Sequence, residues 1–398
     1  MKQIFTNLVA IDDINISKRD IFVEDGFITT EFKSDEETEI IDCNGLVLVP
    51  SFVDMHTHFR DPGFTYKEDL KTGSMSALKG GYTTVNLMPN TNPIVSSKKV
   101  YEDIVKRAKD LDLIDIKQVY SITKDFKSDD LSHLKDLPEG LLFLSNDGKG
   151  VDDDFSMYQA IKIAKKNNLK FTLHEECKEI SKYDYEIAED VMTLRDCYLS
   201  YKMDMPIHFS HVSTKGAIEA IRYFKDLGAK ITCEVTPHHI YFSNRKELKV
   251  NPPIRKEKDR LALLYMIKKG YVDCIATDHA PHSKEEKENG KPGFIGLETA
   301  FSTSYMTLVK AGIISLNDLI RLMSTNPSKL LEIKKGKIKE GYMADFTLID
   351  LDKVYEYKEE DILSKSKNSL FINQKLQGQI VRVYKKGILK YDLNGKTL

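Results

Sequence analysis

The sequence has little cysteine, almost no net charge and no long apolar run. Its five cysteines are odd in number, scattered and never arranged as Cys-x-x-Cys, which argues against a disulfide framework and against a thiolate zinc site. Charged residues make up 30% of the chain but nearly cancel, leaving a net charge of −2, so the basic field that nucleic-acid binding needs is missing. No apolar run approaches the ~20 residues of a membrane span, and no apolar signal segment follows Met1. We therefore expect a cytoplasmic protein with reduced core cysteines and a small-molecule partner.

What the sequence does contain, at both ends, is a series of short strand-like segments. Residues 1 to about 50, and the segments 344–349 and 379–384, are strand-like and separated by turn residues, which indicates a small antiparallel sheet. Such a sheet cannot bury both of its faces alone. We therefore predict a small β-sandwich formed jointly by residues 1–50 and 333–398.

Between these ends, strands and helices alternate, which is typical of a parallel sheet with crossover helices. Eight strand–helix units fit a closed (β/α)8 TIM-like barrel of the α/β class better than an open doubly wound sheet, so we predict a catalytic barrel over residues 51–332. The predicted strands are 46–53, 83–88, 116–122, 141–144, 170–173, 207–209, 230–235 and 274–276. The predicted helices are 70–79, 97–111, 131–137, 155–166, 185–202, 216–227, 258–269 and 298–311.

Histidines cluster where the predicted strands end. In a barrel of this kind the catalytic side chains lie at the C-terminal ends of the strands. His56 and His58 follow the first strand at a spacing of two residues, which in an extended strand points both imidazoles to one side, within reach of one metal ion. An isolated His-x-His is more often incidental. Here, however, nine of the ten histidines fall near the ends of predicted strands, and only His133 is expected on the surface.

The strand ends supply enough ligands for two metal ions. Imidazole and carboxylate ligands without thiolates suit Zn²⁺ in a catalytic site. Two ions would need about six protein ligands, with a carboxylate bridging ions ~3.5–4 Å apart, and would lower the pKa of a bound water from ~15.7 towards ~7. Asp147 is the candidate bridge, and Asp278 could take the proton of the water and return it to a leaving nitrogen. The six candidate ligands are His56, His58, Asp147, His174, His211 and Asp278.

Several motifs of the chain resemble those of dihydroorotases, in the amidohydrolase superfamily, and the bacterial type I form with two metal ions is the most similar. The motifs follow one another in family order over almost the whole chain. They are HTHFRDPG (56–63), MPNT (88–91), HVSTK (211–215), TPHH (236–239), NPP before an arginine (251–253), ATDHAPH (276–282) with Lys287, and GYMAD (341–345).

The resemblance implies a zinc-dependent, reversible cyclisation of N-carbamoyl-L-aspartate to L-dihydroorotate in pyrimidine synthesis. It places one ion on His56, His58 and Asp147, the other on Asp147, His174 and His211, and makes Asp278 a ligand and general acid/base. A dianionic substrate also needs an arginine and further donors around its carboxylate. The residues that the resemblance assigns to the substrate are His58, Arg60, Asn90, Asn251, His282, Pro292 and Gly293.

The chain departs from the family pattern at a few positions. Relatives usually carry two aspartates before the glycine on the fourth strand, but here the first is Asn146, which leaves Asp147 as the only carboxylate for the bridge. A carboxylated lysine is used by many superfamily members, but Lys149 lies in a turn rather than at an inward strand position. The segment after His174 is shorter than expected, and Pro292 replaces a more usual aromatic residue.

The remaining histidines and charges have plainer interpretations. His238 and His239 are adjacent and cannot both face inward on a strand, so we expect structural or supporting roles, as we do for His279. His208 falls on the opposite face from His211 and is expected in the core. Glu175 and Glu176 could orient metal ligands or be solvated. The charge run 284–287 is expected to be a mobile loop near the pocket.

Other functions remain open from the residues alone. Hydantoinases, dihydropyrimidinases and allantoinases act on cyclic amides that mostly lack a ring carboxylate, so Arg60 favours the dihydroorotase reaction. A non-catalytic partner of aspartate carbamoyltransferase is disfavoured because all six candidate ligands are present. A homodimer and a complex with aspartate carbamoyltransferase are both compatible with the resemblance, and the sequence does not fix the native metal.

Overall fold

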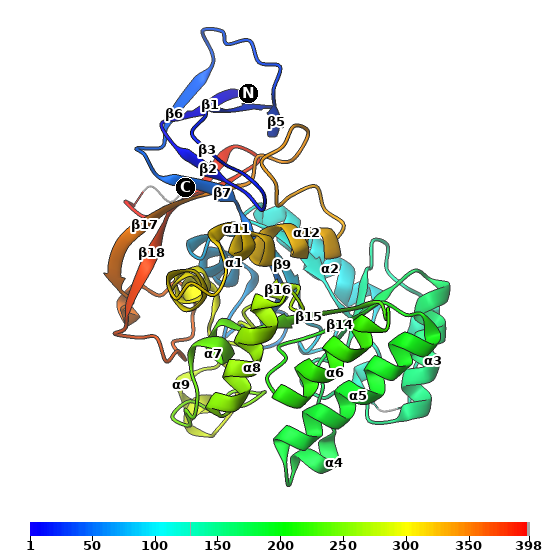
Figure 1. The fold of residues 1–398 in the computed structure, drawn as a ribbon. Helices are drawn as coiled ribbons and strands as arrows, with labels where there is room; N and C mark the ends of the chain where they lie inside the picture. Colours follow the sequence, from blue (N-terminus) through cyan, green and yellow to red (C-terminus); the bar gives the residue numbers. More distant parts are fainter. Residues whose placement is uncertain (128, 396–398) are drawn as a thin grey trace.

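The computed structural model describes residues 1–127 and 129–395, and its centre is a barrel of parallel strands (Figure 1). Each strand pairs in parallel with the next along the chain. The barrel closes where Thr57 bridges His279 in parallel and the His58 N–H donates to the His279 carbonyl at 2.9 Å. The strands are β8 (Phe52–Thr57), β9 (Tyr82–Leu87), β10 (Asp115–Gln118) with β11 (Tyr120–Ser121), β12 (Phe143–Ser145), β13 (Lys170–Leu173), β14 (Ile207–Phe209), β15 (Ile231–Val235) and β16 (Cys274–Ile275).

Helices surround this barrel, and the predicted (β/α)8 class is confirmed. Most of the long helices begin at a side chain that accepts a backbone N–H of the first turn, such as Ser97, Asp184 and Thr214. The outer helices are α1 (Leu70–Lys79), α2 (Lys98–Leu111), α3 (Asp154–Lys166), α5 (Tyr185–Met203), α6 (Lys215–Asp226) and α8 (Glu257–Lys268), and the last unit runs through η3 (Leu297–Thr299), α10 (Ala300–Ser304) and η4 (Tyr305–Lys310). The shorter helices are η1 (Lys124–Phe126), η2 (Ser132–Lys135), α4 (Lys178–Ser181), α7 (Pro237–Tyr241), α9 (Lys284–Glu288), α11 (Leu316–Ile320), η5 (Arg321–Thr325), α12 (Asn326–Leu330) and η6 (Glu359–Asp361). Of the helices in the described residues, none combines the length and the apolar composition needed to cross a membrane.

The predicted first strand, 46–53, is wrong as a single element. The chain breaks at Ser51, whose N–H donates to the Asp345 carbonyl at 2.9 Å and whose hydroxyl lies 2.5 Å from that of Thr83. Before the break, β7 (Val47–Pro50) pairs with a C-terminal strand outside the barrel. Only after it does β8 enter the barrel, so one short stretch of chain belongs to two sheets.

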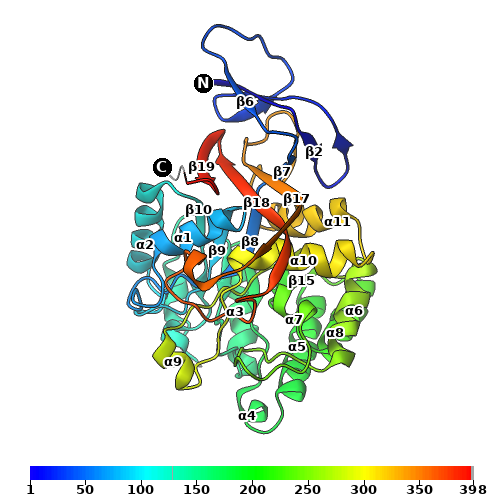
Figure 2. The same cartoon turned by 90° about the vertical axis from the view of Figure 1, so that its left-hand side faces the viewer.

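The two ends of the chain form a β-domain that lies on one end of the barrel (Figure 2). Its sheets have the orders β5-β4-β1-β6 and β19-β18-β17-β7-β2-β3. Their cores are shared, because the ring of Phe5 contacts those of Phe346 and Tyr384 at centroid distances of 5.3 and 5.0 Å. The sheets are mixed rather than purely antiparallel, since β6 pairs in parallel with β1 and β7 with β2. The strands are β1 (Lys2–Thr6), β2 (Val9–Ile11), β3 (Ile16–Ser17), β4 (Ile21–Glu24), β5 (Phe27–Thr29), β6 (Glu39–Asp42), β17 (Phe346–Glu356), β18 (Lys375–Lys385) and β19 (Ile388–Asp392).

One C-terminal segment leaves this β-domain and packs on the barrel mouth. Phe371 is fully buried against Phe242 and Phe294, with ring centroids 4.9 and 5.6 Å apart. Asn368 accepts the His282 N–H at 3.3 Å and donates to the Ala280 carbonyl at 3.1 Å. The domain limits 1–50, 51–332 and 333–398 stay predictions, and the crossing segment shows that the third range contributes to both parts.

Candidate metal centre

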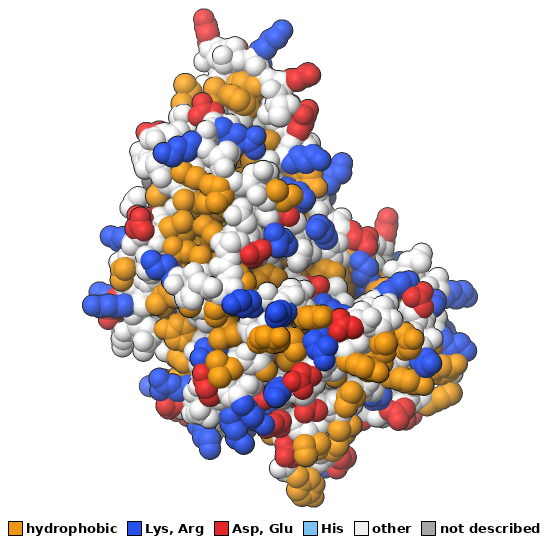
Figure 3. All heavy atoms as spheres, in the orientation of Figure 1, with side chains coloured by type: hydrophobic (Ala, Val, Ile, Leu, Met, Phe, Trp, Pro, Cys, Tyr) orange, Lys and Arg blue, Asp and Glu red, His pale blue; other side chains and the backbone are white. Residues whose placement is uncertain are grey.

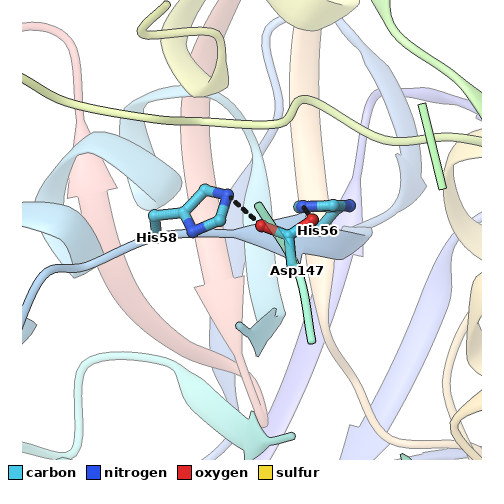
Figure 4. A group of neighbouring side chains, drawn as sticks. All are labelled: His56, His58 and Asp147. Atoms are coloured by element: carbon cyan, nitrogen blue, oxygen red, sulfur yellow. Dashed lines mark ion pairs between the residues drawn. The ribbon is translucent and has the colours of Figure 1, made fainter. Parts of the chain in front are cut away.

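Two histidines from the first barrel strand converge on one carboxylate (Figure 4). His56 lies on β8, His58 follows it, and Asp147 follows β12. His56 Nε2 is 3.1 Å from Asp147 Oδ1, and His58 Nε2 is 3.4 Å from Asp147 Oδ2. All three side chains are buried. The spacing of two residues thus brings both imidazoles to the same point, although the second lies just beyond the strand.

The same carboxylate faces a second pair of histidines. His174 follows β13 and His211 follows β14, and His174 Nδ1 and His211 Nε2 are 2.9 Å apart. Asp147 Oδ1 lies 3.8 Å from His174 Nδ1 and 3.6 Å from His211 Nε2. Asp147 therefore belongs to two ligand groups, each with its ligand atoms within 4.8 Å of one another, which is the arrangement that a bridging carboxylate requires.

Asp278 lies against the first of these groups. Its Oδ1 is 3.1 Å from His58 Nε2 and 3.7 Å from His56 Nε2. Three residues of the site, Arg60, His211 and Asp278, have positive φ angles of 58°, 33° and 46°. Residues other than glycine rarely adopt this conformation, and such strain concentrates at functional sites because the surrounding structure holds it in place.

The donor set fits divalent metal ions. His56 Nε2 and Asp147 Oδ1 are buried and, although 3.1 Å apart, form no well-aligned hydrogen bond with each other or with any other described residue, whereas buried polar atoms are normally satisfied. Burial alone would lower the pKa of His56, but Asp147 and Glu234 raise it well above its usual value. Burial likewise would raise the pKa of Asp147, but the neighbouring histidines lower it well below its usual value. An anionic carboxylate surrounded by imidazole nitrogens, without thiolates, is a typical environment for a borderline divalent cation.

Glu234 contacts the ring nitrogen of His56 that does not face Asp147, and the sequence analysis did not identify this residue. This fully buried carboxylate lies 2.9 Å from His56 Nδ1 and 2.9 Å from His208 Nε2, and accepts the His211 N–H at 3.2 Å. Burial alone would raise the pKa of Glu234, but the hydrogen bonds with His208 and His56 outweigh it and lower this pKa to about 2. A carboxylate on the second nitrogen of a ligating histidine fixes its tautomer and orientation. The one available signal was a charged residue within the apolar strand β15.

Glu176 plays the equivalent part for the second group. Its Oε2 is 2.9 Å from His174 Nε2 and accepts from Asn251 Nδ2 at 2.8 Å. Because Nε2 faces this carboxylate, Nδ1 of His174 is the nitrogen left for a metal ion. Of the two predicted orienting carboxylates, Glu176 therefore contacts a candidate ligand. Glu175 is instead buried beside Asp196 and Arg195, where burial and then Asp196 raise its pKa well above the usual value.

The two asparagines near Asp147 differ in role. Asn90 Oδ1 lies 2.8 Å from His58 Nδ1, and Asn90 Nδ2 donates to Asp147 Oδ2 at 3.3 Å, so this predicted substrate residue also supports both ligands. Asn146 accepts the Thr123 N–H at 3.1 Å and donates to the Thr123 hydroxyl at 2.7 Å. The residue that departs from the family pattern thus joins neighbouring strand ends. Lys149 lies with its Nζ 5.9 Å from the centroid of the Phe126 ring.

Arg60 and His282 lie together at the rim of the site. Arg60 is 9% exposed, donates from Nε to the Pro281 carbonyl at 3.3 Å, and has one terminal nitrogen 3.4 Å from His282 Nε2. A guanidinium carries five N–H groups, so further donors remain for a ligand. Burial, followed by Arg60 and Lys67, lowers the pKa of His282 to about 3. These two predicted residues thus form a compact, donor-rich corner.

The charge run 284–287, expected to be a mobile loop, instead lies within the short helix α9, and Glu286 holds this helix against the loop that follows β8. Glu286 accepts from the Tyr66 hydroxyl at 2.9 Å and lies 2.7 Å from Lys67 Nζ and 3.1 Å from His282 Nδ1. Because Nδ1 of His282 faces a carboxylate, we assign the proton of the neutral imidazole to Nδ1. Nε2 is then free to accept a hydrogen bond from Arg60.

Gly293 lies where no side chain would fit. A Cβ on this residue would be 2.4 Å from the Ala280 carbonyl oxygen and 2.6 Å from His282 Cδ2. Its N–H donates to the Lys249 carbonyl at 3.0 Å, and its carbonyl accepts from Lys287 Nζ at 3.0 Å. Both backbone groups of Gly293 are therefore paired within the chain. The predicted contact of the Pro292–Gly293 backbone with a substrate ring stays a prediction.

The remaining histidines separate into two kinds. His239 lies with Nδ1 2.8 Å from the Thr236 hydroxyl and Nε2 2.9 Å from the Pro252 carbonyl, and His279 contacts Glu68 and the Gly296 N–H. Both therefore have structural partners. His238 is buried, stacks on Phe294 at a centroid distance of 4.9 Å, and has no partner for either nitrogen among the described residues.

His133, expected on the surface, is half-buried, because its Nε2 lies 2.9 Å from the Ser121 carbonyl.

Comparison with known sequences identifies close relatives over the full chain length. A dihydroorotase from Clostridium botulinum is 45% identical over 397 residues, covering 98% of this chain and 100% of that protein. A dihydroorotase from Elusimicrobium minutum is 39% identical, covering 98% of both chains, and one from Aquifex aeolicus is 38% identical, covering 94% of both. The amidohydrolase family model matches residues 47–390.

Solved structures with the same fold come from other branches. An L-hydantoinase (dihydropyrimidinase) from Arthrobacter aurescens has a TM-score of 0.88 at 23% identity, covering 100% of this chain and 97% of that one. A dihydropyrimidinase from Brevibacillus agri has a TM-score of 0.88 at 21% identity, covering 98% and 95%. At these identities the likeness establishes the fold and says nothing of the substrate.

Proposed function

This chain belongs to the amidohydrolase family, and on that premise we propose that it is a dihydroorotase, which interconverts N-carbamoyl-L-aspartate and L-dihydroorotate in pyrimidine synthesis. The observation that carries the proposal is the position of Arg60. Its buried guanidinium contacts the Pro281 carbonyl and His282, three and four residues after Asp278, and therefore lies at the rim of the two ligand groups. Burial lowers the pKa of Arg60, and the nearby Asp278 and Asp147 partly oppose this shift. A substrate with a carboxylate on its ring uses such a cation, whereas most hydantoins and related ureides offer no partner for it.

Two zinc ions are the cofactor that the donor set favours. We assign one to His56, His58 and Asp147 and the other to Asp147, His174 and His211. Divalent ions held by these residues would lower the pKa of a water molecule and polarise the carbonyl of the scissile amide. Glu234 and Glu176 keep the imidazoles turned so that the correct ring nitrogen faces each ion.

Asp278 is the proton-transfer group of this proposal. Its carboxylate lies on the same side of the barrel as both ligand groups and is buried at 6% exposure. In the hydrolytic direction it accepts a proton from the attacking water and delivers it to the ring nitrogen as the amide bond breaks. In the direction of cyclisation the same carboxylate removes the proton from the attacking ureido nitrogen and returns it to the departing water.

Substrate binding is assigned to the rim. Arg60 and His282 bind the ring carboxylate, supported by Asn90, and His58 contacts the substrate from the metal side. Asn251, held by Glu176, and the Pro292–Gly293 backbone are assigned to the ring. The predicted cytoplasmic location and a complex with aspartate carbamoyltransferase stay predictions.

The decisive experiment compares ring opening of L-dihydroorotate by wild type and Arg60→Ala at matched metal content. We expect activity in the wild type and a loss of about 10–100-fold in kcat/KM in the variant, because hydrogen bonds to a charged group contribute ~1.5–3 kcal/mol. Arg60→Lys is the matched control, which keeps the charge without the bidentate geometry and should fall between the two.

Hydantoin and allantoin are the comparison substrates. Wild type that opens either one but leaves L-dihydroorotate untouched would disprove the proposal. A protein that purifies without metal and is equally inactive with and without Asp278→Ala would instead be a non-catalytic barrel.

A further inference from the structure

Asn368 lies in the segment 362–371 between β17 and β18, and its side chain is buried at 6% exposure. Its amide makes two contacts with the loop that carries His282. Asn368 Oδ1 accepts the His282 N–H at 3.3 Å, and Nδ2 donates to the Ala280 carbonyl at 3.1 Å. The Asn368 carbonyl also accepts the Ile295 N–H at 3.1 Å. A single residue therefore contacts three backbone groups of the rim.

These backbone groups lie next to the contacts of Arg60. The Pro281 carbonyl, between Ala280 and His282, accepts from Arg60 Nε at 3.3 Å, and His282 Nε2 is 3.4 Å from a terminal nitrogen of Arg60. The Ala280 N–H donates to the Phe294 carbonyl at 2.7 Å, which joins the two ends of the loop. A shift of the backbone at Ala280 or His282 would therefore change both contacts of the guanidinium.

The same segment also holds the chain that follows Arg60. The Ser366 hydroxyl donates to the Lys67 carbonyl at 2.8 Å, and Lys365 Nζ donates to the Thr65 carbonyl at 2.6 Å. Segment 362–371 is thus hydrogen-bonded both to the loop after β8 and to the loop after β16. These are the two loops that supply the donor-rich corner of the site.

Buried carboxylates hold the segment in place. Glu298 accepts the N–H groups of Leu363 and Ser364 at 2.8 and 3.1 Å. The fully buried Glu68 accepts the Lys365 N–H at 3.3 Å. Hydrogen bonds to an ionised carboxylate are stronger than those between neutral groups. The backbone that leads to Asn368 is therefore fixed before its amide reaches the rim.

The outer surface of the same rim is charged. Figure 3 shows Lys and Arg side chains gathered over α9 at its lower left. Charges in contact with water are screened by salt and contribute little to holding a backbone in one position. The amide of Asn368 is shielded from water, where a hydrogen bond is electrostatically stronger. The buried amide is therefore better suited than the surface charges to fix the rim.

We propose that Asn368 is a positioning residue for the substrate carboxylate and acts through the backbone of residues 280–282. The inference rests on the proposed function, because it concerns the group that Arg60 and His282 bind. Bidentate pairing of a guanidinium with a carboxylate depends on geometry. A displacement of about 1 Å caused by a remote change can reduce the rate about 100-fold. Without the amide, the His282 N–H and the Ala280 carbonyl lose this partner and the corner relaxes.

The first test is the ring opening of L-dihydroorotate by the metal-loaded, full-length chain. Asn368→Leu keeps a side chain of similar size and removes both amide contacts. We expect KM to rise about 10-fold, the lower end of the loss expected for Arg60→Ala, because the guanidinium remains but is displaced. Metal content and kcat should stay nearly unchanged, since Asn368 contacts none of the candidate ligands. An unchanged KM, or a loss of metal that accounts for the fall in activity, would overturn the proposal.

Asn317→Leu is the matched control. Asn317 on α11 donates to the Asp12 and Asn15 carbonyls at 2.7 and 3.3 Å, so it also holds a loop through its amide, but in the β-domain. We expect this variant to keep the KM of wild type. An equal rise in KM in both variants would show that a general loss of stability, and not the position of the rim, explains the result of Asn368→Leu.

A double variant tests the route of the effect. If Asn368 acts through the corner of Arg60 and His282, little is left to position once the guanidinium is removed. Adding Asn368→Leu to Arg60→Ala should therefore reduce kcat/KM by less than Asn368→Leu does in wild type, because contributions of coupled residues are not additive. A reduction as large as in wild type would overturn the proposal.

Hydrogen exchange of backbone amides tests the contact without the reaction. We expect peptides covering 279–296 to exchange faster in Asn368→Leu than in wild type, because the local structure opens more readily, and peptides covering 207–216 to be unchanged. An active wild type whose 279–296 peptides exchange equally fast in Asn368→Leu would overturn this inference alone. A metal-loaded wild type that leaves L-dihydroorotate untouched would overturn the proposed function as well, so the two failures are distinguishable.

Discussion

Two sets of histidines occupy the same barrel mouth, and they differ in what their ring nitrogens contact. His239 and His279 have a protein partner for each nitrogen, either a hydroxyl, a carbonyl, a carboxylate or a backbone N–H. In His56 and His174, one ring nitrogen contacts a carboxylate, and the other faces only further candidate ligands. Burial alone does not distinguish the two sets, because all four are buried. A buried ring nitrogen that lies among other ligand atoms without a hydrogen-bond partner is unfavourable, because it has lost its hydration. Such an arrangement indicates a binding site for a cation.

The strongest test of this comparison removes the carboxylate common to both ligand groups. In Asp147→Asn, a neutral amide replaces the only bridging anion, so the ions repel each other without compensation. We expect metal content to fall from two equivalents to one or fewer and ring opening of L-dihydroorotate to fall to the level of metal-free protein. Elemental analysis alongside the assay measures both, and two retained equivalents would contradict the bridging role.

Substitution of a carboxylate that orients a candidate ligand, such as Glu234, should reduce metal binding less than Asp147→Asn does. Glu234→Gln keeps the shape but weakens the hold on His56, so we expect metal affinity to fall about 10–100-fold. Chelator competition measures the affinity. Glu68→Gln is the matched control, since Glu68 contacts His279 at the same mouth but supports no candidate ligand. Equal losses of metal affinity in Glu234→Gln and Glu68→Gln would show that the two sets of histidines do not differ in their contribution to metal binding.

A third test concerns the carboxylate that holds the segment after His211. Glu189 accepts the Ser213 N–H at 2.7 Å and lies 2.9 Å from Arg255. Burial alone would raise the pKa of Glu189, but Arg255 and Ser213 lower it below its usual value. A carboxylate whose pKa is lower in the folded state stabilises the fold above its unfolded pKa, and this stability is lost as the pH falls through the folded pKa.

Glu189→Gln should therefore destabilise the fold most at neutral pH. We expect a loss of about 3 kcal/mol in the free energy of unfolding, because Arg255, whose side chain is only 10% exposed, is left without its partner. Urea titrations from pH 7 down through the usual glutamate pKa of about 4.3 should show the difference from wild type shrinking as the pH falls. A difference that is constant with pH would contradict the sign of the pKa shift.

The smallest effect is expected for a histidine of the structural set. His239 contacts both Thr236 and the Pro252 carbonyl, and glutamine in His239→Gln can keep only one of these contacts. We expect a loss of about 1–3 kcal/mol in the free energy of unfolding, because the other group is left without a partner. Metal content should be unchanged. A loss of metal in this variant would mean that partnered histidines also contribute to the centre.

The sequence predicted the barrel and the candidate ligands because both depend on local order along the chain. Alternating strands and helices indicate the barrel, and strand ends indicate where side chains such as His174 and His211 meet. Glu234 could not be found this way, because its role depends on two imidazoles that are far from it in sequence. The break at Ser51 could not be predicted either, because an apolar stretch has the same sequence pattern whether it forms one strand or two strands in different sheets.

The segment that carries Asn368 has a consequence for how the protein is made. Proteins fold from the N-terminus as they leave the ribosome, yet the backbone of His282 and the carbonyl of Ala280 obtain their hydrogen-bond partners from a residue 86 and 88 positions later in the chain. The catalytic mouth is therefore completed only after this later segment has been synthesised, and a chain that stopped before Asn368 would contain every candidate ligand without a finished rim.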